Sequence, residues 1–200
     1  MVATERGDET RTRILREAGQ LFAERGYVAT SMGDILRATE LTKGGVYFHF
    51  ASKLELAEAV ITEADERVTA VILDHVRGDG AIDRLLGMVD GAFIACCSPD
   101  MAMITSLSNE LTVVEDRAGK HESPGAQWVD AVETLLIEAR AAGELDAADP
   151  MSPRGQAEML IAAFFGTRDL PGKTSEKAQY KAAYLQMARR LLGLPDEGAW

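Results

Sequence analysis

Apolar residues recur at every third or fourth position along most of the chain, which is the spacing of one buried face of an α-helix. No stretch alternates between polar and apolar residues in the manner of a strand. The sequence therefore predicts an all-α fold. The first predicted helix runs from Thr10 to a stop at Gly26, and its apolar face contains Ile14, Leu15, Ala18, Leu21 and Phe22. Residues 1–9 are polar and are predicted to lie outside it.

Two short helices follow, separated by a turn at Thr39–Leu41. Thr30 or Ser31 is a good N-cap for the second helix, and Asp34 stands at the position that completes a weak capping box with Ser31. Thr42 is the N-cap candidate of the third helix. Val46 and Phe50 are four residues apart, so they share the face that we expect to anchor this helix in the core.

The rest of the chain has the pattern of longer helices. Ser52 and Glu55 form a capping box for a fourth helix that extends towards His75. Polar breaks are predicted at 115–125 and at Glu144–Pro153. The remaining helices are predicted at Ile82–Cys97, from Met101 to Val113 or Val114, at Gln127–Ala142, at Gln156–Leu170 and at Glu176–Leu192.

A short helix, a tight turn and a second short helix make up the plan of a DNA-binding helix-turn-helix. Lys43 and Tyr47 lie on one face of the third helix, where an ammonium group and a phenol can reach DNA. Gly44 and Gly45 cost up to about 1 kcal/mol each relative to alanine in the first turn of this helix. Close approach of a sugar-phosphate backbone explains them, and so does ordinary tight helix packing.

Charge limits this interpretation without excluding it. The net charge is −11, whereas nucleic-acid-binding proteins usually carry a basic surface. Residues 1–53 hold eight Lys and Arg against seven Asp and Glu, a net charge of +1, so the acidic excess lies in residues 54–200. We predict a DNA-binding domain at 1–53 and a ligand-binding and dimerisation domain at 54–200.

The run T-K-G-G-V-Y-F-H-F-A-S-K, preceded by L-F-A-E-R-G-Y-V-A-T-S-M-G-D-I-L, closely resembles the N-terminal domain of TetR-type transcriptional repressors. The chain departs from this family at Thr39-Glu40, where relatives often carry Ala-Gly, so a left-handed backbone there would be strained. The resemblance implies binding to operator DNA, mostly through phosphates. The predicted DNA-binding residues are Thr30, Ser31, Thr42, Lys43, Gly44, Gly45, Tyr47, His49 and Lys53.

The second domain contains Met and aromatic residues at helical spacing, which ordinarily form plain core. Trp128 differs, because its setting S-P-G-A-Q-W, followed by a long helix ending in A-A-G-E-L, resembles the γ-butyrolactone-receptor branch of the family. In that branch the matching tryptophan borders a cavity for a small signal. The resemblance therefore implies a ligand pocket bordered by Trp128. The further pocket candidates are apolar residues of the second domain, for which plain core is the alternative: Met88, Phe93, Met103, Leu107, Phe164 and Phe165.

These features predict a repressor that binds a palindromic operator as a homodimer and releases it on binding a small lipophilic, γ-butyrolactone-like signal. The last two helices are the predicted dimer contact, with Ala162, Ala163 and Gly166 allowing close approach. Two alternatives stay open: a repressor with no small-molecule response, and one that responds to an antibiotic or another hydrophobic metabolite. A ligand-carrying or scaffold protein without a DNA function is a further alternative.

An enzyme is not predicted, because the chain has no Walker loop, no G-x-S-x-G and no dinucleotide fingerprint. Cofactors and metals are not predicted either. His49, His75 and His121 lack metal-ligand spacing, and the adjacent Cys96 and Cys97 are typical of buried filler. The N-terminus does not resemble a signal peptide, and no apolar stretch reaches the roughly 20 residues that span a bilayer. We therefore expect a cytoplasmic protein that does not enter a membrane.

Overall fold

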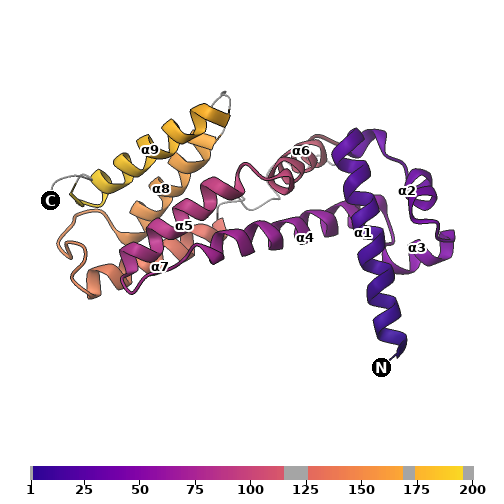
Figure 1. Cartoon of the computed structure of the whole chain (residues 1–200), viewed down its shortest axis with the longest axis horizontal. Coiled ribbons are helices and arrows are strands. Elements are labelled where there is room, and N and C mark those ends of the chain that lie inside the picture. Colours follow the sequence, from indigo (N-terminus) through magenta and orange to yellow (C-terminus); the bar gives the residue numbers. More distant parts are fainter. Residues whose placement is uncertain (1, 115–125, 169–173, 196–200) are drawn as a thin grey trace. The chain divides into compact units, whose positions relative to one another are not determined.

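The computed structural model describes residues 2–114, 126–168 and 174–195, and every regular element in these ranges is an α-helix (Figure 1). The predicted all-α fold is confirmed for this part of the chain. The helices are α1 (Val2–Ala29), α2 (Met32–Thr39), α3 (Lys43–His49), α4 (Lys53–Asp74), α5 (Ala81–Ala95), α6 (Pro99–Val114), α7 (Ala126–Ala141), α8 (Pro153–Arg168) and α9 (Thr174–Leu191).

Some helices extend beyond their predicted ends because polar residues at those ends adopt helical geometry. The prediction that residues 1–9 lie outside the first helix is wrong, because α1 already begins at Val2. That stretch holds no proline, and most of its residues are tolerated in helices. At the other end of α1, Gly26 leaves helical geometry with φ 79°, as predicted for a stop. The predicted polar loop at 115–125 and the predicted helix end at Leu170 lie outside the described residues.

Contacts divide the chain into two compact units. The first unit comprises Met1–Ala70 with Cys97–Lys120, and the second comprises Val71–Cys96 with His121–Trp200. The first unit therefore extends beyond the predicted DNA-binding segment 1–53, because α6 packs against α1. Its core draws on α1, α2, α3, α4, α6 and the connecting segments, through Ile14, Leu15, Ala18, Phe22, Tyr27, Ile35, Val46, Phe50, Leu56, Ala57, Val60, Leu107 and Leu111.

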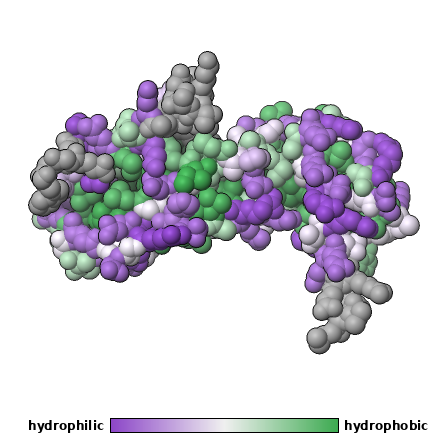
Figure 2. All heavy atoms as spheres, in the orientation of Figure 1, coloured by the Kyte–Doolittle hydropathy of each residue, from purple (hydrophilic) through white to green (hydrophobic). Residues whose placement is uncertain are grey.

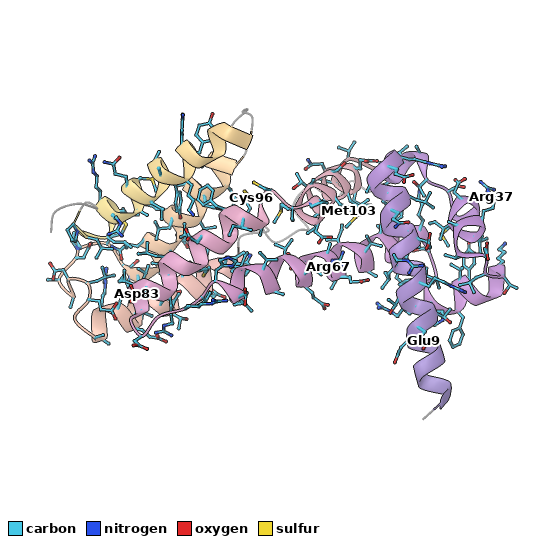
Figure 3. All side chains as sticks on the ribbon, in the orientation of Figure 1. Glu9, Arg37, Arg67, Asp83, Cys96 and Met103 are labelled. Carbon is cyan, nitrogen blue, oxygen red and sulfur yellow. The ribbon has the colours of Figure 1, made fainter. Side chains whose placement is uncertain are left out.

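The surface of the first unit is mostly polar in the view of Figure 2, where hydrophilic residues cover most of its visible face. Arg67 of α4, labelled in Figure 3, donates from Nη2 to Oδ1 of Asp100 in α6 at 2.8 Å. Both side chains are partly exposed, so this ion pair adds little to the free energy of unfolding. The buried apolar side chains are therefore what hold α6 to the rest of the unit.

In the second unit, α7 packs against α5 and α8, and α9 packs against α8. Two glycines of α5 allow the end of α4 to come close: a Cβ on Gly87 would lie 2.1 Å from the carbonyl oxygen of His75, and one on Gly91 would lie 2.7 Å from Cα of Ile72. The carboxylate of Glu144 accepts hydrogen bonds from the N–H groups of Ala81 and Ile82, both at 2.9 Å. These bonds lower the pKa of Glu144 and supply the cap that Gly80 cannot give α5.

No single helix of the described part of the chain is long and apolar enough to cross a membrane; only α5 and α6 taken jointly meet that test of length and composition.

Candidate nucleic-acid interface

The capping of α2 fixes the first half of the helix-turn-helix. Ser31 Oγ accepts a hydrogen bond from the N–H of Asp34 at 3.2 Å, and the Asp34 carboxylate accepts one from the N–H of Ser31 at 2.9 Å. This is the predicted capping box with both hydrogen bonds present. The hydrogen bonds from Ser31, with a smaller contribution from Arg37, lower the pKa of Asp34 to about 2. Ser31 remains exposed beside this cap.

The turn between α2 and α3 carries backbone strain. Glu40 has φ 54° and ψ 24°, and within the described residues it is the one non-glycine residue with positive φ. The sequence flagged this position because related chains often have glycine there. Thr39 supports the turn: it is buried, and its Oγ1 donates to the carbonyl oxygen of Ile35 at 2.9 Å. A left-handed residue with a side chain costs about 1–2 kcal/mol, so the surrounding packing holds this turn in place.

The helix α3 has one buried face and one exposed face. Val46 and Phe50 are buried in the core of the first unit, as predicted. Lys43 and Tyr47 are exposed on the other side, with Lys43 Nζ 5.6 Å from the centroid of the Tyr47 ring. Thr42 caps the helix by accepting a hydrogen bond from the N–H of Gly45 at 3.2 Å. The core thus fixes α3 while its polar groups face outwards.

Gly44 and Gly45 have different surroundings. A Cβ on Gly45 would lie 3.3 Å from Thr42 Oγ1, so packing against its own helix cap restricts this position. A Cβ on Gly44 would have no atom of the described residues within 4 Å, apart from its chain neighbours and the backbone of its own helix. Tight packing within the chain therefore accounts for Gly45 and not for Gly44. The packing of the described residues therefore does not by itself require a glycine at position 44.

Lys53 and Thr30 are used inside the first unit. Lys53 Nζ donates to the carbonyl oxygens of Tyr27 and Thr30, both at 2.9 Å, and lies 4.1 Å from the centroid of the Tyr27 ring. Thr30 is only 1% exposed, and its Oγ1 donates to the carbonyl oxygen of Gly26 at 2.8 Å. The side chain of Thr30 is thus not available for the predicted DNA contact. Lys53 ties the start of α4 to the segment before α2.

Phe48 is the exposed residue of α3 that the sequence analysis left out. Its side chain is 85% exposed, and its ring meets the half-buried His49 edge to face at 5.2 Å between centroids. The helical period already contained this information, since a residue two positions from Val46 points to the opposite side of the helix. The candidate interface therefore consists of Ser31, Thr42, Lys43, Gly44, Gly45, Tyr47, Phe48 and His49.

Three of the predicted ligand-pocket residues pack together in the second unit. The rings of Phe93 and Phe164 meet edge to face at 5.1 Å between centroids, and the ring of Phe165 meets that of Phe164 edge to face at 5.7 Å. Tyr184, which the sequence analysis did not select, completes this aromatic cluster at 5.5 Å from Phe93 and 6.1 Å from Phe164. Its hydroxyl donates to the carbonyl oxygen of Leu160 at 3.0 Å, and burial raises its pKa.

The other predicted pocket residues are divided between the two units. Met88 is buried in α5, and Trp128 is half-buried in α7. Met103 and Leu107 are on α6 and pack in the core of the first unit (Figure 3 labels Met103). The structure therefore does not bring Met103 and Leu107 together with Phe93 and Phe164 inside one unit.

The described residues contain no group of three His, Cys, Asp or Glu side chains that could hold a metal ion. Cys96 is half-buried, with Sγ 3.0 Å from the carbonyl oxygen of Phe93, and Cys97 is exposed.

Comparison with known proteins decides the family. A family model described as bacterial regulatory proteins, tetR family, matches residues 14–60, which include all of α2, the turn and α3. A solved structure described as the molecular basis for control of antibiotic production by a bacterial hormone is 30% identical, with a TM-score of 0.69. That match covers 92% of this chain and 95% of the other chain. The chain belongs to the tetR family.

This TetR-family chain is also similar to the A-factor receptor protein of Streptomyces griseus, with 29% identity over 196 residues. The match covers 96% of this chain and 66% of the receptor, so the chain spans slightly less than two thirds of that relative. A crystal structure of a γ-butyrolactone receptor (ArpA like protein) is 23% identical, with a TM-score of 0.62 over 92% of this chain and 88% of that chain, which shows a shared fold. The predicted resemblance to TetR-type repressors and to this receptor branch is confirmed.

Proposed function

We propose that this TetR-family protein is a ligand-responsive transcriptional repressor of the cytoplasm. It binds a palindromic operator as a homodimer and releases it on binding a small lipophilic, γ-butyrolactone-like signal. The observation that carries the DNA-binding part is the exposed face of α3. Lys43, Gly44 and Tyr47 face solvent there, while Val46 and Phe50 hold the helix in the core.

The chemistry of this face fits duplex DNA. A lysine ammonium group pairs with phosphate, and a tyrosine hydroxyl donates to phosphate or to a base edge. Gly44 leaves room for the sugar-phosphate backbone, since no side chain of the described residues occupies that space. The net charge of +1 over residues 1–53 gives little general attraction to DNA, so affinity depends on these specific contacts and on pairing of two copies.

The exposed face of α8 supports dimerisation. Met159 is 50% exposed, Ala162 and Gly166 are exposed, and among the described residues no neighbouring element comes within 4 Å of a Cβ placed on Gly166. Met187 of α9 is also exposed. Small residues beside exposed methionines suit close packing of α8 and α9 against a second copy. Two helix-turn-helix units placed about 34–36 Å apart then read both halves of a palindrome.

The ligand part rests on similarity to the A-factor receptor protein over nearly the whole chain and on the half-buried Trp128. A signal that binds better to the DNA-incompetent state weakens DNA binding by its differential affinity, typically about 1–3 kcal/mol of coupling.

A repressor with no small-molecule response is the second candidate. The mutual packing of Phe93, Phe164 and Tyr184 favours it, because these rings fill space that a pocket would need.

The deciding experiment is selection of bound duplexes from a random DNA library by the full chain, repeated in the presence of γ-butyrolactones. A palindromic consensus is expected, and the selected duplex should be released by the lactone.

Lys43→Ala and Tyr47→Phe should weaken binding of the selected duplex without changing the far-ultraviolet circular dichroism. Arg77→Ala is the control, because it removes an exposed cation outside the candidate interface. Failure to enrich any duplex refutes the DNA-binding function.

The ligand assignment has its own test. Trp128→Ala should keep full affinity for the selected duplex and lose release by the lactone. A Trp128→Ala protein that still lets go of DNA on lactone addition would contradict the assigned role of this residue. If no lactone changes the affinity of the wild-type chain for the selected duplex, the repressor without a small-molecule response is favoured.

A further inference from the structure

Phe48 is the most exposed aromatic residue of the candidate interface, and its exposure is unusual for its chemistry. Its side chain is 85% exposed, whereas Phe22 and Phe50 in the same unit are buried. A phenylalanine side chain has no hydrogen-bonding group, so its exposure to water is unfavourable and is not offset by hydrogen bonds to water. A residue of this kind on an otherwise polar helix face points to an apolar contact with a partner.

The ring stands away from α3 rather than folding back along it. Side chains of a helix lean towards the preceding turn, which for Phe48 is the turn of Gly44 and Gly45. Among the described residues no side chain lies within 4 Å of the position that a Cβ on Gly44 would occupy, so the Phe48 ring does not cover this glycine. The ring contact recorded for Phe48 is the edge-to-face contact with His49. The ring is therefore free to insert between α3 and whatever α3 faces.

Duplex DNA offers one apolar group on the base edges of the major groove, the C5-methyl group of thymine. Most other features of those edges are hydrogen-bond donors or acceptors, which phenylalanine cannot satisfy. Lys43 and Tyr47, on the neighbouring part of the same helix, have the polar groups for phosphates and base edges. Phe48 can therefore contribute an apolar contact, whereas Lys43 and Tyr47 contribute polar ones.

We infer that Phe48 reads one thymine in each operator half-site by packing its ring against the thymine methyl group in the major groove. This inference rests on the proposed DNA-binding function and adds to it a residue that determines sequence preference. Replacing that thymine by deoxyuridine removes the methyl group and keeps the base pair. Loss of one buried methyl contact corresponds to about a fourfold loss of affinity.

The test replaces each thymine of the selected duplex by deoxyuridine, one symmetric pair at a time, and measures affinity by fluorescence anisotropy. Wild type should lose about fourfold per half-site, or roughly fifteenfold for the pair, at one thymine position. Phe48→Ala should bind the thymine and deoxyuridine duplexes equally at that position, and Phe48→Leu should keep part of the difference. Val113→Ala, which changes an exposed apolar residue on α6, should behave as wild type.

Three outcomes overturn the inference. The first is a deoxyuridine scan of the selected duplex that gives the same affinities for wild type and Phe48→Ala. That result would leave the proposed DNA-binding function intact. The second is a change of oligomeric state in Phe48→Ala, measured by light scattering, since Phe48 would then belong to a protein contact. The third is failure of the wild-type chain to enrich any duplex, which removes the proposed function together with the inference.

Discussion

The carboxylate of Glu110 in α6 accepts a hydrogen bond from the backbone N–H of Val28, with 3.0 Å between Oε2 and N. The same carboxylate occupies the space beside Gly26, where a Cβ would lie 2.6 Å from Oε1. Gly26 also has φ 79°, a backbone conformation that suits glycine. Glu110 thus holds the segment that leads from α1 into the helix-turn-helix. The lack of a side chain at Gly26 leaves the space that the Glu110 carboxylate occupies.

Gly26→Ala should therefore destabilise the protein for two reasons, the positive φ and the collision with Glu110. The positive φ alone costs about 1–2 kcal/mol. Urea unfolding of Gly26→Ala, Glu110→Ala and the double variant measures the coupling between the two positions. The double variant should be more stable than the sum of the two single changes predicts, because removing the Glu110 carboxylate relieves the collision. Strict additivity would contradict the contact.

Gly44→Ala should separate stability from DNA binding. The position is open within the chain, so alanine fits and can raise the free energy of unfolding by up to about 1 kcal/mol. Affinity for the selected duplex should fall at least tenfold, because the added methyl group stands where the DNA backbone approaches. Thermal unfolding and fluorescence anisotropy give the two readouts. A Gly44→Ala protein that binds the duplex as tightly as wild type would show that DNA does not come close to this residue.

Lys53→Met should reduce stability, whereas Lys43→Met should not. The ammonium group of Lys53 donates to two carbonyl oxygens, so its loss removes charge-assisted hydrogen bonds and costs about 1–3 kcal/mol. Lys43 is exposed, and its ammonium group lies beside the Tyr47 ring. Lys43→Met should lose affinity for DNA, because it removes a cation from the candidate interface. Equal unfolding midpoints for Lys53→Met and wild type would show that the internal hydrogen bonds of Lys53 contribute nothing.

The capping box of α2 should make stability depend on pH in the acid range. The pKa of Asp34 falls from 3.8 to about 2 on folding, so the folded state favours the ionised carboxylate. Its stabilisation is complete above pH 3.8 and is lost as the pH falls towards 2. The difference in unfolding free energy between wild type and Asp34→Asn should be constant at pH 5–7 and shrink below pH 3.8. A difference that grows on acidification would have the wrong sign for this mechanism.

Ala162→Glu should dissociate the dimer. A carboxylate on the exposed face of α8 would be buried without a partner between two copies and would repel its symmetry mate. Sedimentation velocity should show a monomer, and affinity for the full palindrome should fall to that for one half-site. Ala147→Glu places the same charge on an exposed residue of the segment before α8 and should leave the dimer intact. A dimeric Ala162→Glu protein would exclude this face of α8.

Short-range chemistry made much of this fold predictable. Ser31, Asp34 and Thr42 form the caps that their residue types and spacing indicated, and Val46 and Phe50 share the buried face that the helical period required. The left-handed turn at Glu40 was visible as a departure from the pattern of related chains. Each of these features depends on residues within one helical turn of one another, so the sequence alone contains the necessary information.

Long-range packing was not predictable in the same way. Thr30 looked like an exposed cap and is buried, and Lys53 looked free for phosphate and binds two carbonyl oxygens. Leu107 was assigned to a ligand pocket and lies in the core beside residues of α1. An apolar residue on a helix shows only that the face is buried, and the identity of the covering element comes from the three-dimensional fold.

The participation of Leu107 and Leu111 in the core of the first unit has a consequence for how this protein is made. A ribosome finishes α1, α2 and α3 long before it reaches α6, so during synthesis the apolar side chains of α1 that meet α6 stay uncovered. The nascent helix-turn-helix becomes a complete folded body only after Val114 has left the exit tunnel. We therefore expect fragments cut after α4 to expose this apolar surface of α1, and a stable DNA-binding fragment to include α6.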